Sequence, residues 1–219
     1  MIYKVITGSR AMNINLPKSD YDLLVVTEKE LDKTSFKKMG YDLLSLKPKD
    51  FINPNYPKGG FAHYLDLFPS VYCLDNDLTD WLKENREDIV LASLPKVLEV
   101  FNNSAQHFYR RATNAEEQKM FKHFARVLHT YNILHNYAEG KTFADSVRAT
   151  GEERDLILSI RKGEVPQEEV IELLQKTKAR AISVENFYKE PRADMRVLDE
   201  FKHMVYREVE LLNKEEGGN

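Results

Sequence analysis

Short apolar runs separated by polar segments fill the first third of the chain. Their length and their β-branched and aromatic content predict strands at residues 2–6, 20–26, 41–46 and 61–68. The polar segment Thr27–Lys38 predicts a short helix in which Leu31 and Phe36 make the apolar contacts. Three prolines and two glycines within Lys47–Gly60 predict a loop before the fourth strand, which Pro69 is expected to end.

From about Trp81 onward, apolar residues recur at helical spacing. Pro95 suits the first turn of one helix, and Asn114 is expected to cap a longer one that stops before Gly140. Further helices are expected over residues 152–162, 166–188 and 193–212. Because strands come first and helices follow, we expect an α+β protein with a small mixed-sheet domain at 1–92 and an all-helical domain at 93–219.

Composition narrows the class of protein. The chain has 219 residues, 42% of them hydrophobic, and a net charge of −3, so it carries no overall basic signal for nucleic acid. Cys73 is the single cysteine, which rules out an internal disulfide and a thiolate metal cluster. No apolar run approaches the roughly 20 residues of a membrane span, and a strand is expected directly after Met1. We therefore expect a cytoplasmic protein with no membrane partner.

The turn between the first two strands carries the residues that suggest chemistry. Gly8 permits a tight turn, and Ser9 and Arg10 follow at the start of a short helix, where backbone N–H groups favour an anion. Asp20 and Asp22 are two residues apart on the returning strand, so we expect their carboxylates on one face. Such a pair is costly unless a cation lies between the two groups. Mg²⁺ or Mn²⁺ carrying a nucleoside triphosphate would satisfy both the turn and the pair.

The ordered combination of Gly8-Ser9-Arg10-Ala11 and Ser19-Asp20-x-Asp22-Leu23 resembles the signature of the DNA polymerase β-type nucleotidyltransferase superfamily. The resemblance implies that Asp20 and Asp22 bind metal and that Gly8 and Ser9 hold phosphates, with Arg10 able to reach a phosphate or to remain a solvated arginine. It also implies a third acid on a neighbouring strand, which would help to deprotonate the attacking hydroxyl. Asp66 is the first candidate for this acid, and Asp42 is the alternative.

A second group of candidates lies on the long helix. Lys119, His123 and Arg126 fall at positions i, i+4 and i+7 and share one face, which either binds the triphosphate or acceptor or is an ordinary solvated surface. This run, and the later segment from Arg154 to Glu164, resemble the helical tail of uncharacterised bacterial and phage nucleotidyltransferase-like proteins.

These patterns predict a metal-dependent nucleotidyltransferase that moves a nucleoside monophosphate from a triphosphate to a hydroxyl or phosphate acceptor. The acceptor is left open among a small molecule, RNA and protein. The alternative is a regulatory or binding protein on the same fold, such as an antitoxin-like partner, with weak or no catalysis. The six histidines lack the spacing of a zinc site, and no Gly-x-Ser-x-Gly or Walker-type loop occurs.

Overall fold

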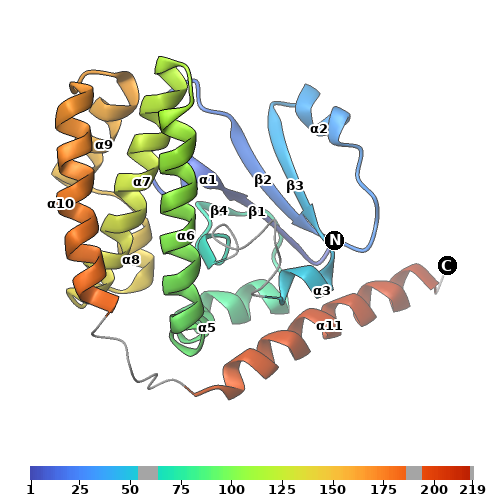
Figure 1. Cartoon of the computed structure of the whole chain (residues 1–219). Helices are drawn as coiled ribbons and strands as arrows, with labels where there is room; N and C mark the ends of the chain where they lie inside the picture. The colour runs from blue at the N-terminus through green and yellow to red at the C-terminus, as the bar shows by residue number, and fades with distance from the viewer. Residues whose placement is uncertain (54–63, 186–193, 218–219) are drawn as a thin grey trace. The chain divides into compact units, whose positions relative to one another are not determined.

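The computed structural model describes residues 1–53, 64–185 and 194–217 of the chain. It confirms the α+β class, with a small mixed sheet and its helices first and an all-helical region after it (Figure 1). Within the described ranges, none of the helices combines the length and the apolar character needed to cross a membrane. The contacts divide the chain into two compact units, which are described separately below.

The first unit is built on a four-stranded sheet of order β3-β2-β1-β4. Strands β1 (Tyr3–Thr7), β2 (Tyr21–Val26) and β3 (Tyr41–Leu46) lie where the apolar runs predicted them. Strand β1 is antiparallel to β2 and to the short β4 (Val71–Tyr72), whereas β2 and β3 are parallel. This mixed pairing brings the end of β1 and the starts of β2 and β3 to the same edge of the sheet.

One face of the sheet is covered by the polar segment after β2. Ile6, Leu23, Val25 and Leu43 form a buried cluster, and Leu31 and Phe36 pack against it as the sequence predicts. The helix itself, α2, spans only Lys33–Lys38, because Asp32 accepts a hydrogen bond from the Thr34 amide and so fixes its start.

The predicted fourth strand is wrong where the structure describes it. Tyr64 and Leu65 are helical and residues 66–67 form a turn, while positions 61–63 of the prediction lie outside the described residues. The edge strand is instead β4, whose flanking amides, those of Ser70 and Cys73, donate to β1 carbonyls. The predicted loop at 47–60 also begins with a short helix, α3 (Pro48–Phe51), since Pro48 suits a first helical turn. Residues 54–60 of the predicted loop lie outside the described residues.

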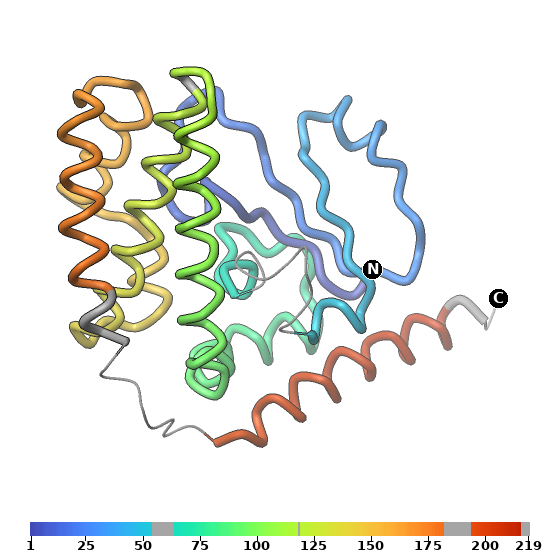
Figure 2. Tube along the Cα trace, in the orientation of Figure 1, coloured from blue at the N-terminus to red at the C-terminus, as the bar shows by residue number. Residues whose placement is uncertain are grey.

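Two helices complete the first unit, α5 (Asp77–Ala92) and α11 (Arg196–Gly217), which lie side by side (Figures 1 and 2). Phe201 of α11 stacks on Trp81 of α5 with ring centroids 6.1 Å apart, and meets Phe51 of α3 edge-on at 5.4 Å. The last helix, which the sequence analysis assigned to the helical domain, thus packs with the sheet unit, which comprises residues 1–12, 17–93 and 192–219.

The second unit contains residues 13–16 and 94–191. Helix α6 packs along α7, and α7 also contacts α8, α9 and α10. The bounds are α6 Leu94–Thr113, α7 Glu117–Ala138, α8 Phe143–Val147, α9 Gly151–Lys162 and α10 Gln167–Glu185. Gly163 adopts a left-handed φ of 76° and ends α9 as predicted.

The expected cap of the long helix is wrong by two residues. The side-chain amide of Asn114 donates a hydrogen bond to the Arg110 carbonyl, which is one of the carbonyl groups left without a backbone partner at the end of α6. The residue before α7 is Glu116, whose side chain makes no capping hydrogen bond.

Candidate active site

Gly8 and Asp22 approach each other so closely that no other residue fits at position 8. Gly8 opens the four-residue helix α1 (Gly8–Ala11) with a φ of 66°, and Thr7 of β1 lies directly opposite Asp22 of β2. A Cβ atom on Gly8 would lie 1.8 Å from Oδ2 of Asp22. The backbone of the turn and this carboxylate are therefore one compact arrangement, as the sequence predicts.

Arg10 is held at the edge of this arrangement by the start of β2. Its guanidinium donates to the carbonyl oxygens of Ser19, at 2.7 Å, and Asp20, at 3.4 Å. It also lies 3.6 Å from the centroid of the Tyr21 ring, in a cation–π contact. These contacts fix the entry into β2, and Tyr21 is a contributor that the sequence analysis missed.

The remaining predicted residues of the turn are only partly enclosed. Ser9 is half-buried in α1, Asp22 is half-buried in β2, and Asp20 is exposed just before the strand begins. Strand β2 starts one residue later, at Tyr21, so Asp20 lies outside it. The alternation of a strand therefore does not place the Asp20 carboxylate on the same face as that of Asp22.

Asp42 lies beside Asp22 on the neighbouring strand. The parallel register pairs Tyr21 with Tyr41 and Asp22 with Asp42, and the two tyrosine rings meet at 6.0 Å. Residues paired in this way point to the same face of a sheet, so the two carboxylates are neighbours. The sequence carried the signal, because the tetrapeptide Tyr-Asp-Leu-Leu occurs at both 21–24 and 41–44.

Asp66 is buried, with 3% of its surface exposed, but its described contacts lead elsewhere. Its backbone carbonyl accepts a hydrogen bond of 2.9 Å from the Tyr3 hydroxyl. Tyr3 pairs with Val26, whereas Thr7 pairs with Asp22, so Tyr3 and Asp22 belong to opposite ends of the β1–β2 ladder, about 13 Å apart along the strand. A metal-binding role of Asp66 stays a prediction, and Asp42 is the acid that the register brings next to Asp22.

The carboxylates fit a magnesium ion whose coordination shell is completed by water and substrate phosphates. Across the described ranges, no three His, Cys, Asp or Glu side chains are placed to hold a metal among themselves. Mg²⁺, however, commonly takes only one or two protein carboxylates and fills its other positions with water and substrate phosphates. Asp22 and Asp42 supply such a pair, and Asp22 packs directly against the backbone of Gly8.

Lys119, His123 and Arg126 belong to the second unit and occupy one face of α7. Lys119 is exposed and pairs with Glu116 at 3.2 Å. His123 stacks on Phe108 of α6 with ring centroids 6.0 Å apart, and the Arg126 guanidinium lies 5.5 Å from the centroid of the same ring. Burial, followed by the neighbouring cations Arg111 and Lys122, lowers the pKa of His123.

Two arginines of the segment 154–164 hold the backbone of residues 13–14. Arg154 donates to the Asn13 carbonyl at 3.0 Å, and Arg161 donates to the Ile14 carbonyl. The Asn13 side chain in turn donates to the Ala149 carbonyl at 2.9 Å. These hydrogen bonds attach residues 13–14 to the segment 149–161 within the second unit.

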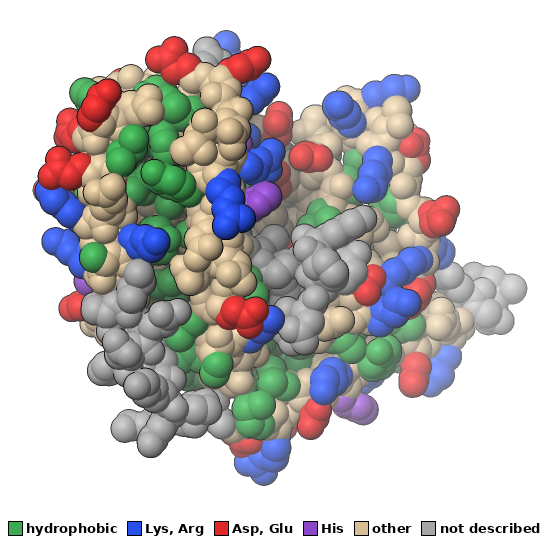
Figure 3. Space-filling view, in the orientation of Figure 1, with side chains coloured by type: hydrophobic (Ala, Val, Ile, Leu, Met, Phe, Trp, Pro, Cys, Tyr) green, Lys and Arg blue, Asp and Glu red, His purple; other side chains and the backbone are tan. Residues whose placement is uncertain are grey.

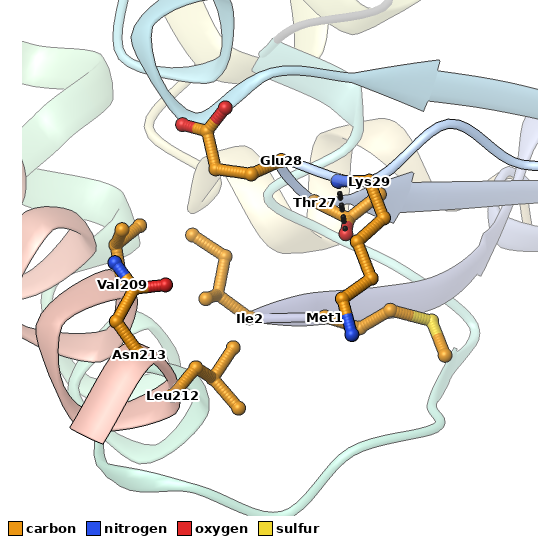
Figure 4. Close-up of a pocket in the computed structure, with 8 residues that line it drawn as sticks. All are labelled: Met1, Ile2, Thr27, Glu28, Lys29, Val209, Leu212 and Asn213. Atoms are coloured by element: carbon orange, nitrogen blue, oxygen red, sulfur yellow. Dashed lines mark hydrogen bonds between the residues drawn. The ribbon is translucent and has the colours of Figure 1, made fainter. Parts of the chain in front are cut away.

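A small pocket in the first unit lies at the other end of the strands from Gly8 and Asp22. Figure 4 shows its lining, which comes from the start of β1, the turn after β2 and the C-terminal half of α11. Its volume is ≈ 30 Å³, room for one or two water molecules and far below that of a nucleotide site.

Comparison with known proteins gives no assignment: no protein-family model, no curated protein and no solved structure matches this chain.

Proposed function

We propose that the chain is a metal-dependent nucleotidyltransferase that binds a nucleoside triphosphate at the turn formed by Gly8, Ser9 and Asp22. The observation that carries the proposal is the close approach of the Asp22 carboxylate to Gly8. It places the Asp22 carboxylate directly against the turn, so a metal ion held by Asp22 would lie next to the backbone proposed to bind the phosphates. Asp42, one strand away and in register, supplies the second carboxylate.

In the proposed reaction, the attacking hydroxyl or phosphate oxygen bonds to the α-phosphorus, and the bond to pyrophosphate breaks. Mg²⁺ or Mn²⁺ would neutralise the charge that develops on the phosphate oxygens. Asp22 and Asp42 would hold this ion, with exposed Asp20 beside them. Asp66 as the general base remains part of the proposal. Lys119, His123 and Arg126 lie in the second unit and are proposed to bind phosphate there. The single cysteine and the absence of a disulfide support activity in the cytoplasm.

Label transfer tests the reaction type. Incubation with Mn²⁺ and triphosphates labelled at the α- or the γ-phosphate, together with small-molecule, RNA and protein acceptors, should transfer only the α-label. Transfer of the γ-label would indicate a kinase. Binding of triphosphate without any transfer would favour the second candidate, a regulatory or binding protein on this fold with weak or no catalysis.

A further inference from the structure

Basic and aromatic side chains meet where the last turns of α6 run beside the first turns of α7. We call the set His107, Arg111, Lys122, His123 and Arg126 the basic face. His107 and Arg111 are four residues apart on α6, and Lys122 and Arg126 are four apart on α7. The stacking of Phe108 on His123 fixes the two helices at this level. In Figure 3, Lys and Arg side chains gather beside a His side chain over the upper half of α6.

The two helix segments that form this face carry no acidic residues of their own. Residues 104–113 and 118–138 contain no Asp or Glu. Among the described residues, Arg111 and Lys122 form no ion pair, whereas Lys83, Lys176 and Lys202 each pair with a carboxylate three or four residues away. After burial, the groups that lower the pKa of His123 are all basic side chains: Arg111, Lys122, His107 and Arg126. The local potential is positive although the whole chain carries a net charge of −3.

Flat rings lie among these charges. His107 is exposed and meets the half-buried Phe108 ring at 5.9 Å, and Arg126 lies over the same ring. Histidine rings and arginine planes can stack on unpaired bases, while cations follow the phosphates. An acidic polypeptide would use the charges but not the rings.

We propose that the basic face binds the backbone of single-stranded nucleic acid. Arg111, Lys122 and Arg126 contact phosphates, and the exposed His107 ring provides a surface on which a base can stack. The face extends about 6 Å along each helix, so it engages only a few nucleotides and binds weakly, in the micromolar range or above. This proposal concerns the second unit by itself and does not require the nucleotidyltransferase reaction.

Fluorescence anisotropy with labelled oligo-dT tests the proposal on the full chain, without triphosphate or divalent metal. Three phosphate contacts predict a slope of about −2 for the logarithm of the association constant against that of salt concentration. The double variant Arg111→Gln/Lys122→Gln should bind about tenfold more weakly, with a slope of about −0.7. The matched control Lys176→Gln/Lys178→Gln removes two exposed charges from α10 and should bind like the parent.

Three outcomes would overturn the proposal. They are no binding at low salt, equal weakening by both double variants, and binding of poly-glutamate as tight as that of the oligonucleotide. The last result would indicate a general anion surface suited to acidic proteins. Both double variants replace exposed side chains, and circular dichroism would verify that they retain the helical content of the parent.

Discussion

At the residue scale, the close approach of Gly8 and Asp22 explains why the turn needs glycine twice over. The φ of 66° disfavours any side chain, and a Cβ would collide with the carboxylate of Asp22. The proximity of the Gly8 turn to Asp22 was therefore predictable from sequence, whereas Asp20 lies just before the strand that it was predicted to share with Asp22. The detailed contacts were not predictable, because the position of Asp42 depends on strand register, which the chain sets through the pairing of whole strands.

Gly8→Ala is expected to lower the unfolding free energy and to weaken triphosphate binding. The left-handed backbone alone costs about 1–2 kcal/mol, and moving the Asp22 carboxylate adds to this cost. Gly40→Ala is the matched control, since Gly40 has a φ of 85° with no atom within 4 Å of the new Cβ. Urea unfolding of both variants separates the two contributions. Equal losses of stability would show that the Asp22 contact is unimportant.

At the scale of elements, apolar periodicity located most helices and three strands, but it failed at residues 64–68, the described part of the predicted fourth strand. Tyr64, Leu65, Leu67 and Phe68 are all buried, in a helical turn and a bend. A run of consecutive buried residues shows neither the period of a strand nor that of a helix, so the sequence pattern could not distinguish the two. The two-residue strand β4 is too short to leave a pattern. Asn114 was likewise ambiguous, because a side-chain amide can serve the end of one helix as well as the start of the next.

Helices α7 and α9 are joined by a buried polar contact that sequence did not predict. His129 is fully buried, and its Nε2 donates to the Val147 carbonyl at 3.0 Å. Its Nδ1 lies 3.6 Å from Oε1 of Glu153, an electrostatic contact longer than a hydrogen bond, and the Asn136 amide donates to the other Glu153 oxygen at 3.0 Å. Burial alone would raise the pKa of Glu153, but His129 and Asn136 outweigh it and the pKa is lowered.

This contact predicts how stability depends on pH. Because the pKa of Glu153 is lower in the folded chain, its stabilising contribution is present above its ordinary pKa of 4.5 and is lost as pH falls through the folded value. Glu153→Gln should therefore flatten the loss of stability between neutral and acid pH, measured by urea unfolding at several pH values. Glu152→Gln, an exposed neighbour on α9, should keep the parental dependence. An unchanged profile in Glu153→Gln would contradict this account.

At the scale of the whole molecule, the chain returns to its first unit after completing the second. The chain passes from the first unit to the second between α5 and α6, and sequence could not indicate that α11 packs with the sheet unit. An amphipathic helix shows that it needs an apolar partner and not which one. The partners are aromatic side chains of α3 and α5 that lie far from α11 in sequence.

Phe201→Ala tests the importance of this returning helix for the first unit. Phe201 is 3% exposed and contacts Trp81 and Phe51, so its truncation should cost about 3–5 kcal/mol. Trp81 is the only tryptophan, and its fluorescence should report the loosened contact directly. Tyr206→Ala on the exposed side of α11 should have little effect. Similar losses in both variants would mean that the helix contributes no specific packing.

Calorimetric titration of the protein with a nucleoside triphosphate in the presence of Mg²⁺ tests the proposed active site most directly. The parent chain should bind the metal–triphosphate complex, and Asp22→Asn should lose this binding while its apo form becomes equally or more stable, because one of two neighbouring carboxylates is neutralised. Asp88→Asn makes the same charge change at an exposed site on α5 and should bind normally. Undiminished binding by Asp22→Asn would contradict the assignment of Gly8 and Asp22 as a metal–triphosphate site.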